Sequence, residues 1–148
     1  KNCYGVWESG YTSTEADPRG IEADGNLDGI YPDHLRQSDF VVENMTIVNN
    51  AANTTDNVDR MQDVIKIRRG AKATITNALV KGSGGTIDLI DMNDSKGAGN
   101  AASSISITHT LNFKNKLNGT LNTFTEPTTN TGADASLFTW SGYNFSSL

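Results

Sequence analysis

The chain has 148 residues, enough for one domain, and its net charge of −5 argues against nucleic acid as a partner, because phosphate binding requires clusters of Lys and Arg. No apolar run approaches the roughly 18 residues of a membrane span, and no signal peptide is present. The single cysteine, Cys3, excludes an internal disulfide, and we interpret it as a small buried or edge residue and not as a reactive thiol. Because the sequence starts at Lys1 without a Met, we expect an upstream part of the same protein.

Short segments that alternate apolar and polar residues recur along the chain and predict strands with one buried face. Abundant Gly, Asn, Thr and Ser favour turns and short strands over long helices. In chain order, the strands are expected at residues 4–7, 11–14, 21–25, 40–48, 64–67, 73–76, 86–89 and 105–113. Polar loops separate these strands, and an apolar cluster at residues 137–145 follows them.

Similar pairs of motifs recur in the same order. IEADG, VIKIRRG and TIDLID each precede a longer strand segment, which is FVVENMTIV, ATITNALV and ISITHTLNF in turn. A pattern that returns after about 22 residues is typical of the stacked coils of a parallel β-solenoid. An antiparallel sandwich would bury the same residues but would not explain the constant order. In the longer segments, the equivalent positions are Val42, Ile75 and Ile107, followed two residues later by Asn44, Asn77 and His109.

Stacked coils place equivalent residues about 4.8 Å apart, so each position forms a ladder along the stack. One ladder of opposite charges is expected to point outward, where neighbouring signs attract. An asparagine ladder of Asn44 and Asn77 would bond through the side-chain amides. The inward ladders are expected to be Ile21–Ile65–Ile87 and Ala23–Ile67–Leu89, and the charged ladder Glu22–Lys66–Asp88.

The motifs GIEADG (residues 20–25), IRRG (67–70), TITNALV (74–80) and IDLID (87–91) resemble those of secreted, mostly uncharacterised β-helix proteins of Bacteroidetes-type bacteria. The resemblance implies an all-β, right-handed parallel β-helix with long inserted loops and a C-terminal capping segment. It also implies a protein that is secreted or held at the outer cell surface. The chain would be the C-terminal part of a longer β-helix, with a lead-in coil at residues 1–20, core coils at 21–116, and a C-terminal extension and cap at 117–148.

Acidic residues near the predicted coils raise the question of calcium, which prefers six to eight oxygen ligands. The candidates are Asp24, Asp28, Asp88 and Asp91, which stacking would bring near one another. The segment DGNLDG (residues 24–29) has some of the spacing of a calcium loop but lacks the closing Glu of an EF-hand. Solvated carboxylates that take part in the charge ladder are the simpler interpretation.

Arg68 is the one candidate for catalysis. β-Helix polysaccharide lyases pair an arginine base with calcium-bound carboxylates, so Arg68 beside a uronate could in principle remove a proton. The simpler interpretation is an ion pair between Arg68 and Asp24 of the neighbouring coil.

Aromatic residues could stack on sugar rings, and the candidates are Trp7, Tyr11, Tyr31 and Trp140. The competing role of Trp140, with Phe145, is to cover an open end of the solenoid, which must be protected. His34 and His109 lack a third ligand, so hydrogen-bonding or surface roles are favoured over metal binding.

The sequence therefore predicts a secreted or cell-surface β-helix module without evident catalytic activity. Such a module would bind a glycan or a cell-surface protein, or would serve as a structural part of a surface assembly. The alternative is a lyase-like, polysaccharide-active enzyme that uses Arg68, nearby carboxylates and calcium.

Overall fold

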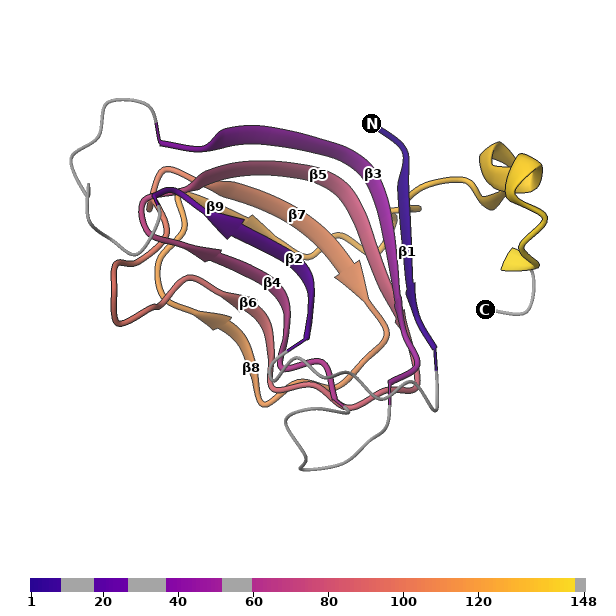
Figure 1. The fold of residues 1–148 in the computed structure, drawn as a ribbon, viewed down its shortest axis with the longest axis horizontal. Helices are drawn as coiled ribbons and strands as arrows, with labels where there is room; N and C mark the ends of the chain where they lie inside the picture. Colours follow the sequence, from indigo (N-terminus) through magenta and orange to yellow (C-terminus); the bar gives the residue numbers. More distant parts are fainter. Residues whose placement is uncertain (9–17, 27–36, 52–59, 146–148) are drawn as a thin grey trace.

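The computed structural model describes residues 1–8, 18–26, 37–51 and 60–145, and within them the chain forms two parallel sheets (Figure 1). The first sheet contains, in order, β1 (Cys3–Trp7), β3 (Asp39–Asn49), β5 (Lys72–Gly82), β7 (Ser104–His109) and β9 (Thr123–Thr125). The second sheet contains β2 (Arg19–Asp24), β4 (Asp63–Arg68), β6 (Asp88–Asp91) and β8 (Asn115–Asn118). A short 3-10 helix, η1 (Ala135–Ser141), lies near the C-terminus.

Successive strands alternate between the two sheets, and every paired strand of the described residues runs parallel to its neighbour. Each coil therefore passes once through each sheet before the next coil stacks on it. This topology is a parallel β-helix and confirms the predicted fold class. It also excludes the antiparallel sandwich. The predicted strand at residues 11–14 lies outside the described residues.

The long strands β3 and β5 bend at their middle and line two sides of the helix (Figure 1). The bend coincides with Asn44 and Asn77, whose φ angles are +57° and +52°. This left-handed backbone conformation is uncommon outside Gly, but Asn tolerates it better than most residues do. At this bend β5 has one more residue than β7, because the β5–β7 register shifts between Ile75 and Ala78.

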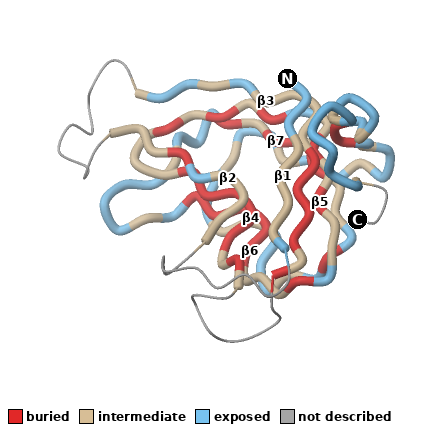
Figure 2. The backbone as a smooth tube through the Cα atoms, turned by 45° about the vertical axis from the view of Figure 1, so that its right-hand side comes forward, coloured by how far each residue is buried: buried red, intermediate tan, exposed pale blue. Residues whose placement is uncertain are grey.

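The core is built from aliphatic ladders between the sheets, visible as buried stretches along β4, β5 and β6 (Figure 2). Ile65 stacks between Ile21 and Ile90, and Leu117 continues the ladder. The prediction that Ile87 would occupy this rung is wrong by three residues. Ile87 still belongs to the turn before β6, where its N–H donates to the carbonyl of Gln62 at 2.9 Å.

The coils continue beyond the range predicted as core. β8 pairs with β6, and β9 pairs with β7, so the stack reaches Thr125 and not residue 116. Sequence reasoning missed these strands because they are short and mostly polar, with Leu117 and Phe124 as their main apolar residues. Their backbone pairing to the coil above supplies the stability that their side chains lack.

The segment after β9 turns back across the outer face of the first sheet, from β7 toward β1. The hydroxyl of Thr108 donates to the carbonyl of Pro127, and the N–H of Ala133 donates to the hydroxyl of Thr46 at 2.9 Å. η1 then lies beside β1 (Figure 1). We refer to residues 126–133 as the strap, because it contacts β7, β5 and β3 in turn.

Aromatic contacts fix the end of the chain on β1. The ring of Tyr4 meets Phe138 at 5.8 Å and Phe145 at 4.6 Å between centroids. The capping role predicted for Trp140 is wrong, because its side chain is 82% exposed. Cys3, which begins β1, is exposed, so it is an edge residue and not a buried one. No helix of the described residues is long and apolar enough to cross a membrane.

Candidate functional site

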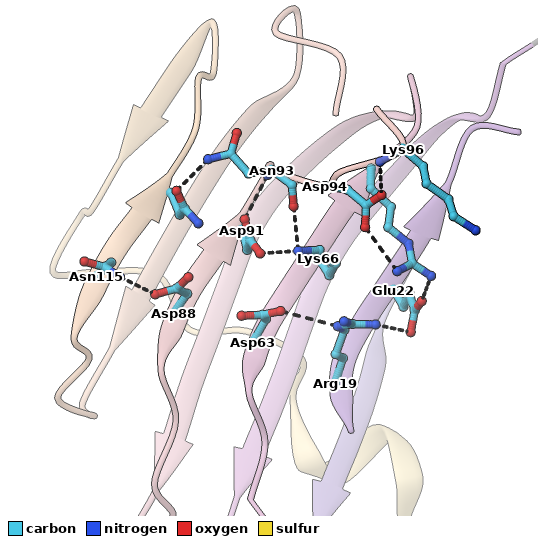
Figure 3. A network of polar contacts seen from close by, with 12 residues as sticks. Arg19, Glu22, Asp63, Lys66, Asp88, Asp91, Asn93, Asp94, Lys96 and Asn115 are labelled. Atoms are coloured by element: carbon cyan, nitrogen blue, oxygen red, sulfur yellow. Dashed lines mark hydrogen bonds and ion pairs between the residues drawn. The ribbon is translucent and has the colours of Figure 1, made fainter. Parts of the chain in front are cut away.

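Charged and polar side chains cover one face of the second sheet and contact one another between coils (Figure 3). The strands stack them in two rows. The first row runs Arg19, Asp63, Asp88 and Asn115, and the second runs Glu22, Lys66, Asp91 and Asn118. We call these two rows the charged lattice.

The second row contains the predicted ladder of alternating charge, with one correction. Lys66 lies between Glu22 and Asp91, and the ammonium group of Lys66 donates to the carboxylate of Asp91. Asp88, which was predicted for this rung, stacks on Asp63 instead. The three-residue error is the same one that misplaced Ile87: the matching motifs are DVIK and DLID, and both begin with Asp.

Arg68 sits at the end of β4 within a cage of carboxylates. Its guanidinium donates to Asp24 and Glu22 of the neighbouring coil, and it lies 3.5 Å from Asp94. The predicted pair with Asp24 is therefore present. The hydrogen bond to Asp24, followed by the other carboxylates, raises the pKa of Arg68 above its already high ordinary value. The loop after β6 completes the cage, because the N–H of Arg69 donates to the carbonyl of Gly97 at 2.6 Å.

A cluster of three buried aspartates lies at the centre of the charged lattice. Asp63, Asp88 and Asp91 each offer a carboxylate oxygen, and these oxygens lie within 4.8 Å of one another. Each carboxylate has a donor: Arg19 reaches Asp63 at 3.3 Å, and Asn115 reaches Asp88 at 2.7 Å. The ammonium of Lys66 serves Asp91 and also donates to the carbonyl of Asn93 at 2.6 Å.

Asp63 carries the electrostatic cost of this arrangement. Burial raises its pKa, and the nearby charge of Asp91 raises it further, while Lys66 and Arg19 oppose the shift. Like charges stacked directly across strands repel. The positive charges of Lys66 and Arg19 therefore offset part of the repulsion between Asp63 and Asp88. The sequence signal for the cluster is the Asp that begins both β4 and β6, and the predicted register did not place these two residues together.

The predicted calcium ligands that the structure describes, Asp24, Asp88 and Asp91, do not gather into one set of ligands. Asp24 is engaged by Arg68 and lies 3.6 Å from Arg69, and Asp28 falls outside the described residues. Asp88 and Asp91 do meet, together with Asp63, but Lys66 already supplies a positive charge to Asp91. Calcium requires six to eight oxygen ligands, whereas much of this set is committed to ammonium, guanidinium and amide donors. The residues present therefore do not fit calcium.

The fold agrees with a comparison to known families. A family model described as a pectate-lyase-like beta helix domain matches residues 3–143. The chain belongs to this family. No curated protein and no solved structure matches the chain.

The aromatic residues that the structure describes in this pectate-lyase-like β-helix domain do not form one surface. Trp7 packs partly buried against the core, whereas Trp140 projects from η1. Tyr143 is 40% exposed, and its hydroxyl donates to the carboxylate of Glu8. The candidates Tyr11 and Tyr31 lie outside the described residues, as does His34. Within the described part of the chain, exposed aromatic surface is therefore gathered at η1 and the residues that follow it.

The asparagine ladder of the β-helix domain is present and longer than predicted. Asn77 donates to Asn44 at 2.8 Å, and Asn44 donates to Asn2 at 3.0 Å. His109 does not occupy the next rung, because it stacks on Val80. The ladder continues into the strap instead, where the N–H of Thr131 donates to the side-chain oxygen of Asn77 at 2.8 Å.

His109 belongs to a separate polar contact between β7, β8 and the strap. Its two ring nitrogens face the carbonyl of Leu111 at 2.9 Å and the carboxylate of Glu126 at 2.8 Å. Lys116 also pairs with Glu126, at 2.9 Å. Because both nitrogens are engaged, His109 offers no ring nitrogen to a substrate or a metal ion in this geometry.

Proposed function

We propose that this pectate-lyase-like β-helix domain is a non-catalytic module that binds a polysaccharide outside the cell. The observation that carries the proposal is the cage around Arg68. A base must be neutral before it can take a proton, and the cage of Glu22, Asp24 and Asp94 favours the charged guanidinium. Arg68 thus joins neighbouring coils.

The aspartate cluster does not replace Arg68 as a catalytic set. Asp63, Asp88 and Asp91 are 6%, 5% and 7% exposed, so a sugar chain cannot reach their carboxylates without local opening. A general acid or base must lie within hydrogen-bond reach of the substrate. The cluster therefore supports a structural role, in which neighbouring coils are joined by neutralised charges.

Sugar binding is supported by the aromatic surface at η1. Trp140 is 82% exposed, and aromatic faces stack on the C–H faces of sugar rings. A secreted or outer-surface location follows from the resemblance to secreted β-helix proteins of Bacteroidetes-type bacteria. A cell-surface protein would be the other partner suited to an exposed aromatic patch.

A panel of soluble polysaccharides tests the proposal, with binding measured by affinity electrophoresis and calorimetry. The variant Trp140→Ala should weaken binding about tenfold, since one stacking contact contributes on the order of 1 kcal/mol. Leu137→Ala is the matched control, because Leu137 is exposed on the same helix but has no aromatic face. Equal effects of the two variants, or binding to no polysaccharide, would refute sugar binding through Trp140.

Catalysis is tested separately with uronate polymers. The ultraviolet absorbance of unsaturated products should stay at the level of the polymer alone, with and without calcium. Product formation by the natural chain that disappears in Arg68→Lys would establish the lyase alternative and overturn the non-catalytic assignment.

A further inference from the structure

The 3-10 helix η1 presents one face to the solvent. A 3-10 helix has three residues per turn, so residues three apart lie above one another. Asp134, which caps the N-terminus of η1, therefore begins a row that continues through Leu137 and Trp140. Asp134 is exposed, and Leu137 and Trp140 are 51% and 82% exposed. We call these three residues the η1 ridge.

The opposite face of η1 packs against β1, which fixes the direction of the ridge. The ring of Phe138 meets Tyr4 of β1 at 5.8 Å and Phe145 at 5.7 Å between centroids. Gly142, whose φ is +72°, ends the helix, and its N–H donates to the carbonyl of Thr139 at 3.2 Å. The ridge is therefore held on a folded support beside β1 (Figure 1).

Two carboxylates belong to this aromatic surface. The carboxylate of Asp134 accepts from the N–H of Ser136 at 2.9 Å. The carboxylate of Glu8 accepts from the hydroxyl of Tyr143, which is 40% exposed. Hydrogen bonds from Ser136, the backbone one first, lower the pKa of Asp134, so this group stays ionised in mildly acidic solution. Because both donors are neutral, neither hydrogen bond cancels the negative charge of its acceptor.

Positive charge is missing from the same part of the chain. The sequence contains no Lys or Arg from residue 117 to its end. Lys1, which precedes β1, pairs with Glu43 at 3.2 Å, and this carboxylate offsets its charge. Within residues 1–8, 18–26, 37–51 and 60–145, neither Asp134 nor Glu8 forms an ion pair. The aromatic surface therefore carries net negative charge.

We propose that the η1 ridge selects polysaccharides whose sugars carry protonated amino groups and discriminates against uronate polymers. The inference rests on the proposed function, because it names the class of polysaccharide that the same surface binds. The indole face of Trp140 attracts an ammonium group through its π electrons and stacks on the sugar ring that carries it. The carboxylates of Asp134 and Glu8 attract the ammonium group as well, whereas they repel the carboxylate of a uronate.

Calorimetry with three oligosaccharides tests the inference. They are a β-1,4-linked glucosamine oligomer, the same oligomer after N-acetylation, and an oligogalacturonate of equal length. We expect the glucosamine oligomer to bind about tenfold more tightly than its acetylated form at low salt, and the difference to shrink at high salt. The oligogalacturonate should bind more weakly than either form.

The outcomes separate this inference from the proposed function. Equal binding of the two glucosamine forms, or tighter binding of the oligogalacturonate, would overturn the inference and leave polysaccharide binding intact. Binding of none of the three oligosaccharides would also overturn the inference. Only the absence of binding across the whole polysaccharide panel would refute the proposed function as well.

A double variant that keeps both hydrogen bonds locates the charge effect. In Asp134→Asn combined with Glu8→Gln, the amides still accept, and Asn caps helices as well as Asp does. The preference for the amino form over the acetylated form should fall from about tenfold to below about threefold. Asp39→Asn, which removes an exposed carboxylate from the start of β3, outside its pairing with β1, should leave the preference unchanged. A preference that survives the double variant in full would overturn the assignment of selectivity to these carboxylates.

Discussion

The side-chain amide of Asn77 donates to the side-chain oxygen of Asn44 in the coil above, at 2.8 Å, and both residues have a positive φ. The same side chain thus serves two purposes at the bend of the strand. It tolerates the left-handed backbone, and it bonds the coils at the point where the sheet turns a corner. Asn2 extends this ladder at one end and Thr131 of the strap at the other.

Replacing Asn77 separates these two contributions. Asn77→Ala should lower the free energy of unfolding by about 2–4 kcal/mol, because it loses the ladder bonds and places Ala, which tolerates the left-handed region less well than Asn, at a positive φ. Asn77→Gly loses the same bonds but adopts positive φ freely, so its loss should be about half as large. Urea denaturation measures both values. Equal losses in the two variants would show that the backbone conformation contributes nothing.

Lys66 is the central cation of the charged lattice. Lys66→Met should lower the free energy of unfolding by about 3–5 kcal/mol, because Asp91 is then left buried without its partner. Asp91→Asn added to Lys66→Met should recover much of this loss, since it removes the stranded charge. A double variant less stable than Lys66→Met would contradict the pairing. Together with the single variant Asp91→Asn and the natural chain, these proteins form a thermodynamic cycle that gives the coupling energy directly.

Calcium should not stabilise the natural chain. A ligand that binds only the folded state stabilises it by an amount that grows with the logarithm of the ligand concentration divided by Kd, and the unfolding midpoint rises accordingly. Because Lys66 and Arg19 already pair with Asp91 and Asp63 of the aspartate cluster, we expect the midpoint to be the same in calcium, in magnesium and in chelator at equal ionic strength. A rise specific to calcium would show that the cluster accepts the ion.

The architecture could be predicted from the sequence because recurring apolar positions determine which strands stack. The positions of β2, β3, β4, β5 and β7 follow from alternation, and so does the order of the two sheets. The register of β6 could not be predicted in the same way. The segment IDLID contains Ile followed by Asp twice, and either copy could stack on Ile65 and Lys66. Only the turn contact between Ile87 and Gln62 selects the second copy. β8 and β9 could not be predicted either, because they are short and mostly polar and are held by backbone pairing to the preceding coil.

The candidate sites were predictable only in part. The Arg68–Asp24 contact and the asparagine ladder join neighbouring coils at positions that stacking determines, so the sequence was sufficient. The aspartate cluster depends on the correct register of β6, and its sequence signal is the Asp that begins both β4 and β6. The path of the strap is likewise set by tertiary contacts, such as that between Ala133 and Thr46.

Asp63 should make stability fall with rising pH over part of the acidic range. Burial and Asp91 raise the pKa of Asp63, so the folded chain holds this proton more tightly than the unfolded chain. Between the ordinary aspartate value of about 4 and the raised folded pKa, ionisation therefore costs stability. Asp63→Asn removes this dependence, and its stability relative to the natural chain should increase with pH through that window.

Urea denaturation at a series of pH values measures this difference. The loss of the pair with Arg19 adds an offset, so the slope with pH and not the sign of the difference is decisive. Asp39→Asn is the control, because Asp39 is exposed and pairs only with Lys72 in the described residues. A difference between Asp63→Asn and the natural chain that does not vary with pH would contradict the raised pKa.

Glu126 should show the opposite dependence on pH. Hydrogen bonds from Lys116 and then His109 lower the pKa of Glu126, so its ionised form stabilises the folded chain. This contribution is present above the ordinary glutamate value of about 4.3 and is lost as pH falls through the lowered folded pKa. Because the side chain is about one-third exposed, the contribution to the free energy of unfolding should be below about 1 kcal/mol.

Hydrogen exchange detects the effect more sensitively, because Glu126 begins the strap. Glu126→Gln should speed amide exchange at Thr131 and Ala133 at neutral pH, and it should have no effect once the pH lies below the lowered pKa. Glu43→Gln is the control, since the Lys1 side chain that pairs with Glu43 is 80% exposed. Equal acceleration by Glu126→Gln at all pH values would mean that the carboxylate charge does not hold the strap.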